Sequence, residues 1–165
     1  MIEKSDIEKN LQKIDQLFTG SSSIQEGLLY SKLAILELCG WIETSMDNIV
    51  LDMAHRVILD PKHLRHFNIT VRKVYGFEYE KHFRHMIITL VGLHGVEAME
   101  KNVDLRAFLP MRAALNDLKP YRDKQAHGYI QGTTLHLDAP SITLGRFHTV
   151  HAGLVDIDGV LKSML

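Results

Sequence analysis

The sequence predicts an all-α fold, a helical bundle around one long helix at about 24–59. Apolar residues recur at steps of three and four through most of the chain, and prolines or glycines separate these stretches. Alternation typical of strands is confined to one short segment. With 165 residues, 45% of them hydrophobic, the chain can bury a core, and we expect a single domain over 1–165.

The long helix is the clearest element. Ser23 and Glu26 have the spacing of a capping box, in which each side chain bonds to the backbone at the other residue. Asp60-Pro61 is expected to stop the helix, which would then be about 50 Å long. We expect its core-facing seam to contain Leu29, Leu33, Leu36, Trp41, Ile42, Met46, Ile49, Val50, Met53 and Val57.

The other helices are shorter. We expect them at 5–18, 63–75, 78–99, 104–119, 120–128 and 138–165. Gly92 and Gly95 allow close packing or a break in the third of these. Pro120 is expected to restart a helix, because proline suits a first turn better than a helix interior. Residues 133–138 alternate between polar and apolar and are expected to form a short irregular or β-like excursion.

Charge is unevenly distributed, although the formal net charge is only −1. Residues 61–85 carry six Lys or Arg against two Glu: Lys62, Arg65, Arg72, Lys73, Lys81 and Arg84. This segment is the candidate basic surface, and a solvated helix face is the alternative interpretation. Because the whole chain has no strong positive field, any RNA site must be a local patch.

Cys39 is the only cysteine, which excludes an intrachain disulfide and favours a reducing compartment. It lies in an apolar stretch, where a buried, inert thiol is expected. The N-terminus lacks the pattern of a signal peptide, and no stretch approaches the run of about 18 uncharged apolar residues that a membrane helix needs. We therefore expect a cytoplasmic protein without a membrane partner.

Residues 121–129 combine a fixed cation, a carboxylate and an imidazole. Arg122 is followed by Asp123, and His127 comes five residues after Arg122. If a helix started at Pro120, Arg122 and Asp123 would lie in its first turn, where free N–H groups favour an anion such as phosphate. Other Arg and His pairs have a similar spacing, but only Arg122 combines a carboxylate neighbour with an expected helix start.

This motif resembles that of the HEPN superfamily, small helical proteins of which many are metal-independent endoribonucleases. The family pattern is an Arg, a polar residue and a His a short distance further on. The ending His127, Gly128, Tyr129 is similar to HEPN toxins that are paired with nucleotidyltransferase antitoxins. The resemblance implies an RNA substrate, no metal or cofactor, and a homodimer with a composite site in which Arg122, Asp123 and His127 are catalytic.

The chemistry of these side chains agrees with RNA cleavage. One group must remove the 2′-OH proton, another must protonate the departing 5′-oxygen, and cations must stabilise the transition state. His127 can be base or acid, and Arg122 can bind the scissile phosphate bidentately. Asp123 would orient one of them or hold the backbone. Each chain supplies one such His, so a two-fold dimer is expected to supply the second proton carrier.

The geometry sets a condition on this site. Residues five apart on a straight helix lie about 140° apart, so Arg122 and His127 share a face only if the helix ends or the Arg reaches around. Lys124 and Tyr129 are further candidates for RNA binding. By the same resemblance Tyr129 is a candidate for nucleotidylation, and a Tyr packed on the core is the alternative.

Two other functions remain open from the sequence. One is a non-catalytic HEPN-like module for dimerisation or partner binding. The other is a metal-dependent helical enzyme, because three His-x-x-His pairs each place two imidazoles on one helix face. These pairs are His63 with His66, His82 with His85, and His148 with His151.

Overall fold

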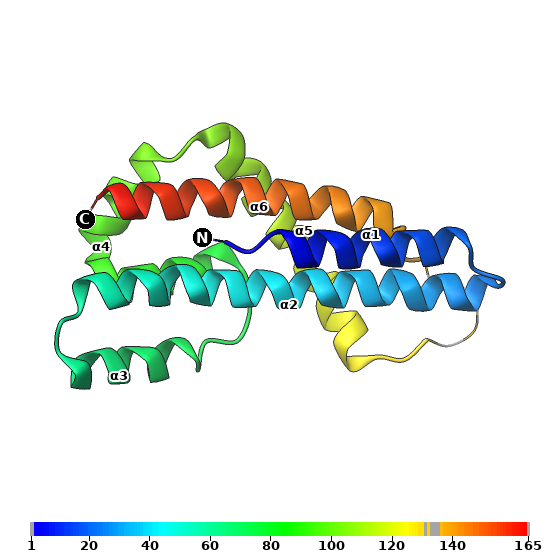
Figure 1. The fold of residues 1–165 in the computed structure, drawn as a ribbon, viewed down its shortest axis with the longest axis horizontal. Helices are drawn as coiled ribbons and strands as arrows, with labels where there is room; N and C mark the ends of the chain where they lie inside the picture. The colour runs from blue at the N-terminus through cyan, green and yellow to red at the C-terminus, as the bar shows by residue number, and fades with distance from the viewer. Residues whose placement is uncertain (1, 131, 133–135, 165) are drawn as a thin grey trace.

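The computed structural model of the chain describes residues 2–130, 132 and 136–164. Its centre is the long helix α2, Ile24–Val57, which contacts all the other α-helices. Figure 1 shows α1 (Ser5–Thr19) and α6 (Pro140–Ser163) along one side of α2. On the opposite side lie α3 (Pro61–Val71) and the C-terminal turns of α5 (Leu105–His127). The predicted all-α class is confirmed for the described residues, which contain no strand.

Short polar side chains define where the helices begin. The N–H of Glu26 donates to Ser23 Oγ over 3.2 Å, as the capping box requires, while the Glu26 carboxylate accepts from the N–H of Ser22 rather than of Ser23. Asp60 caps α3 by accepting from the N–H groups of Lys62 and His63. Asp104 likewise caps α5. These caps satisfy backbone donors that have no partner inside the helix.

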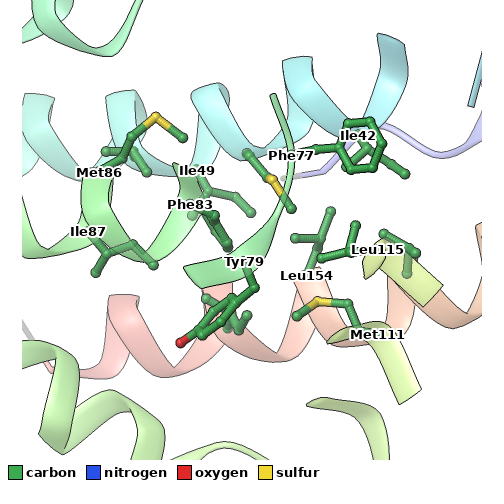
Figure 2. Close-up of a cluster of buried hydrophobic side chains, with 14 of the residues drawn as sticks. Ile42, Ile49, Phe77, Tyr79, Phe83, Met86, Ile87, Met111, Leu115 and Leu154 are labelled. Carbon is green, nitrogen blue, oxygen red and sulfur yellow. The ribbon is translucent and has the colours of Figure 1, made fainter. Parts of the chain in front are cut away.

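The core runs along α2 and joins the remaining helices. Figure 2 shows residues of α2, α5 and α6 packed around Phe77 and Phe83. The labelled residues from these three helices are Ile42, Ile49, Met111, Leu115 and Leu154. The predicted seam is correct from Ile42 to Met53 and wrong near both ends of α2, because Leu29, Leu33 and Val57 are 53%, 43% and 36% exposed. Ala34, Ile35 and Leu38 are buried instead, so the buried stripe is rotated relative to the expected one.

A π-helical turn, η1 (Tyr79–Phe83), leads directly into α4 (Arg84–Asn102). The helix breaks at Gly92, whose φ of 72° is non-helical, so the predicted weak point is confirmed there. Gly76 precedes η1 with φ of 128°, and a Cβ at this position would lie 2.7 Å from the His82 ring. Glycine is therefore required where the coil after α3 turns into η1.

Helix α5 continues through both of its prolines, Pro110 and Pro120. The prediction that a helix restarts at Pro120 is wrong. An interior proline costs about 3 kcal/mol, because it removes one hydrogen bond and crowds the preceding turn. The buried Leu115 and Leu118 precede Pro120 and the buried Gln125 follows it, so α5 stays packed against its neighbours on both sides of this defect. As a result Arg122 lies near the end of a helix, and its N–H is not a free anion-binding donor.

The segment between α5 and α6 is described only in part. Residues 133–135 of the expected excursion lie outside the described residues, and 136–139 have no regular secondary structure. Helix α6 then begins at Pro140, where Asp138 pairs with Arg146 over 2.7 Å.

Among the described residues, none of the helices combines the length and the apolar character needed to cross a bilayer.

Candidate functional site

Arg122 is the best-positioned cation of the predicted motif. Its guanidinium donates to the carboxylate of Glu43 on α2 and, over 3.1 Å, to that of Asp123. It also lies over the ring of Phe77, 5.8 Å from the ring centroid. These bonds use two of the five N–H groups of a guanidinium, so further donors remain for a phosphate.

Asp123 orients Arg122 and not His127. Its other carboxylate oxygen accepts a hydrogen bond from Lys119, one turn earlier on α5. The bond to Lys119, together with the charge of Arg122, lowers the pKa of Asp123. In the described structure Asp123 therefore stays ionised and is bonded to both Lys119 and Arg122.

The α2 side of the site contains two carboxylates one turn apart, Glu43 and Asp47. Partial burial lowers the pKa of Arg122. The negative charges of Glu43 and Asp123 outweigh this effect, so the pKa of Arg122 is raised overall. No salt bridge to Asp47 is present among the described residues. Burial, and then the charge of Glu43, raise its pKa to about 6, although Arg72 of α3 opposes this. Together Arg122, Lys119, Glu43 and Asp123 carry no net charge.

His127 is the last residue of α5 and is exposed. Since α5 is helical from Arg122 to His127, the two side chains leave the helix about 140° apart. No hydrogen bond joins them among the described residues. The geometric condition set by the sequence is therefore not met within one chain, and a single copy does not assemble the full constellation.

The end of α5 is tied to the exposed side of α2. Lys32 Nζ donates to the carbonyl of Gly128 over 2.7 Å. Leu29 and Leu33, one turn apart, are exposed on this part of α2, and Lys32 follows Leu29 by three residues. Tyr129 is 78% exposed, so the alternative of a Tyr packed on the core is not supported. Lys124 is also exposed.

The histidine pairs lie on different elements of the molecule. His63 and His66 are exposed on α3, His82 lies in η1 and His85 in α4, and His148 and His151 lie on α6. Within 2–130, 132 and 136–164, no three His, Cys, Asp or Glu side chains come together in an arrangement that could hold a metal ion. The metal-enzyme alternative thus has no support from the geometry.

The basic segment 61–85 divides into two parts. Lys81 pairs with Glu78 over 2.9 Å, and Arg84 pairs with Glu100 over 2.8 Å. By contrast, the four cations of 62–73 form no salt bridge with any described carboxylate, and all are exposed. The open basic surface is consequently α3 together with its C-terminal cap, a smaller region than the sequence indicated.

Sequence reasoning missed Glu43, Lys119 and Phe77, which position Arg122. Glu43 carried a usable signal, because it interrupts the apolar stretch of α2 and a carboxylate there needs a partner. Phe77 carried none, since its place beneath the guanidinium depends on the path of the coil after α3. No protein-family model matches this chain, and neither a curated protein nor a solved structure matches it.

Proposed function

We propose that the protein is a metal-independent endoribonuclease of the HEPN type, which acts as a homodimer with a composite active site. One observation carries the proposal: a half-buried Arg122, oriented by Glu43 and Asp123, precedes an exposed His127 by five residues at the end of α5. The all-helical architecture around a long α2 is consistent with the same family.

Each side chain has a definite task in this mechanism. Arg122 binds the scissile phosphate with donors that Glu43 and Asp123 leave free, and it stabilises the charge that develops in the transition state. His127 of one copy removes the 2′-OH proton, and the 2′-oxygen attacks the phosphorus. His127 of the second copy protonates the departing 5′-oxygen, which completes chain cleavage to a 2′,3′-cyclic phosphate and a 5′-hydroxyl.

The exposed leucines supply the reason for a second copy. Leu29 and Leu33 flank Lys32, which holds the end of α5 through Gly128. An apolar stripe beside the site that one chain leaves incomplete is well placed for a two-fold contact, because the same residues then meet across the axis. Such a contact brings the two α5 ends, and with them both His127 side chains, toward one cleft.

Tyr129 and Lys124 extend the proposal to RNA binding and regulation. Both are exposed near His127, and Tyr129 offers a phenolic ring for base stacking or for modification. If the protein is a toxin or defence ribonuclease, a nucleotidyltransferase antitoxin that modifies the Tyr129 hydroxyl would place a negative charge beside the RNA path. Modification of Tyr129 would then abolish RNA binding.

A non-catalytic binding module is the second candidate, and the exposed Leu29 and Leu33 favour it as well. Cleavage of single-stranded RNA in EDTA separates the two functions. We expect His127→Ala to reduce the cleavage rate by at least about 100-fold, because it removes both proton carriers. The matched control is His94→Ala, which removes an exposed histidine of α4 and should retain the wild-type rate.

The other outcomes have definite meanings. Equal cleavage by the wild type and His127→Ala, or no cleavage by either on any RNA offered, overturns the ribonuclease proposal and favours the binding module. Cleavage that EDTA abolishes in the wild type would instead indicate a metal-dependent enzyme.

A further inference from the structure

Helix α3 exposes a continuous face of cations. Its outward residues recur at steps of three and four: Lys62, Arg65, His66, Ile69, Arg72 and Lys73. Phe67 and Val71 form the opposite, buried face. From 61 to 77 the chain contains no Asp or Glu, so α3 has no acidic residue that offsets these charges. Four fixed positive charges thus lie close together, Lys62 and Arg65 within α3 and Arg72 and Lys73 directly after it.

These charges differ from most other arginines of the molecule in lacking partners. Arg84, Arg112, Arg122 and Arg146 each form a salt bridge with a described carboxylate. Arg65 forms none, and Arg72 acts only at longer range on the carboxyl of Asp47. Repulsion between neighbouring cations on one short helix is unfavourable, and a polyanion would relieve it.

The face is also shaped for an extended ligand. A surface hollow of about 350 Å³ lies along α3, with Ile69 and Leu64 in its apolar part and Arg65 and Arg72 beside them. Tyr75 follows in the coil and is 81% exposed. Cations that bind the backbone and an aromatic ring on which a base stacks are the two features of single-strand recognition.

The cationic face leads toward the candidate active site. Phe77 follows Arg72 by five positions, so their Cα atoms are at most about 18 Å apart. Phe77 lies beneath the Arg122 guanidinium. Figure 1 shows α3 and the end of α5 on the same side of α2. A strand bound on α3 and passing Tyr75 is therefore directed to Arg122 within a few nucleotides.

We propose that α3 and Tyr75 form the surface that binds single-stranded RNA and delivers its scissile phosphate to Arg122. The inference rests on the proposed function in taking RNA as the ligand. It also supplies what the active site lacks, because Arg122, Lys119, Glu43 and Asp123 together are neutral and attract a polyanion weakly. A membrane surface fits less well, since the described face offers only Ile69 and the partly buried Leu64 as large aliphatic side chains.

Binding measurements without cleavage test this surface. Fluorescein-labelled single-stranded RNA of about 12 nucleotides, within the range that one such site covers, is titrated with the His127→Ala protein and followed by anisotropy. Adding Arg65→Ala and Arg72→Ala should raise the Kd about tenfold at low salt and reduce the slope of log K against log salt by about 1.4. Tyr75→Leu should raise the Kd about fivefold without changing this slope.

The control removes the same charge from another face. Lys9→Ala with Lys13→Ala takes two exposed lysines from α1, on the other side of α2, and should change the Kd by less than about twofold. The α3 substitutions lie at exposed positions, and an unchanged thermal midpoint would show that they leave the fold intact. Equal Kd values for the α3 variant and the α1 control would overturn the proposal.

Two results separate this inference from the proposed function. If the wild type binds RNA through Arg65 and Arg72 but cleaves none, the ribonuclease proposal fails and the surface stands. If His127→Ala abolishes cleavage while the α3 variants bind and cleave like the wild type, the surface fails and the ribonuclease stands. Phosphatidylserine vesicles that bind as tightly as RNA, with the same dependence on Arg65 and Arg72, would reassign the face to membranes.

Discussion

The α3 surface and the junction of η1, α4 and α5 contain the same kinds of side chain in opposite states. At the junction, Arg84 and the Tyr79 hydroxyl both donate to Glu100 over 2.8 Å. Arg112 pairs with Glu80 and lies 5.1 Å from the Tyr79 ring centroid. On α3 and its C-terminal cap, Arg65 and Arg72 form no salt bridge with any described carboxylate, and the nearby Tyr75 is 81% exposed. Internal pairing makes the junction part of the scaffold, whereas open charge leaves α3 available for a ligand.

The end of α5 combines both states. Arg122 is paired as the junction arginines are, yet its neighbour His127 is as open as the α3 residues. Under the proposed function, pairing would hold Arg122 in one orientation for the phosphate, and exposure would leave His127 free to meet a substrate and a second copy. Paired charges are thus held in position, whereas exposed charges remain available to bind a partner.

Glu100 accepts hydrogen bonds from both Tyr79 and Arg84, so its removal should have the largest effect on stability. We expect Glu100→Ala to lower the free energy of unfolding by about 2 kcal/mol, because the buried Tyr79 hydroxyl loses its acceptor and Arg84 loses its partner. Urea denaturation measures this free energy of unfolding. The α3 variant Arg65→Ala with Arg72→Ala should change stability by less than about 0.5 kcal/mol. Similar losses in both variants would remove the distinction between the two regions.

A smaller effect is expected at Asp47, which lies between Arg72 and Glu43. Its folded-state pKa of about 6 exceeds the ordinary value of 3.8, so its contribution favours folding at low pH and is lost as the pH rises through about 6. We expect Asp47→Asn to be about 1 kcal/mol more stable than the wild type above pH 7. The pKa shift corresponds to a free energy of at most about 3 kcal/mol, and partial exposure of Asp47 to water reduces this value.

Unfolding at a series of pH values between about 4 and 8 measures this difference, which should grow from low to high pH. The same series on Asp117→Asn controls for the loss of one negative charge from the surface. A difference that is constant with pH, or that shrinks as the pH rises, would contradict a carboxyl held partly protonated beside Glu43.

Local signals predicted the helices well. The cap at Ser23 depends on a side chain that bonds to backbone within three residues, so sequence spacing suffices to find it. Asp60 was expected only to stop the long helix, and the structure shows that it also caps α3. Pro120 shows the limit of such reasoning, because burial of Leu115 and Leu118 against distant helices outweighs a local preference. Leu29 and Leu33 were misassigned for a related reason: periodicity identifies an apolar stripe, but the arrangement of neighbouring helices decides which part is covered.

The site was predicted in part. The motif identified Arg122, Asp123 and His127, and the structure shows how the first two are joined. Glu43 is 79 residues from Arg122 along the chain, and no spacing rule connects residues so far apart. The basic segment was also recognised, but its division into paired and open cations depends on Glu78 and Glu100 meeting Lys81 and Arg84 in space.

The composite site is the central claim, and mixing subunits tests it most directly. Wild-type protein at a fixed concentration is allowed to exchange subunits with increasing amounts of His127→Ala, and RNA cleavage in EDTA is measured. Two imidazoles from two copies predict that activity falls as hybrid dimers replace wild-type dimers, while the same additions of His94→Ala do not lower it. Activity that stays constant as the His127→Ala protein is added, despite demonstrated exchange, would contradict the claim.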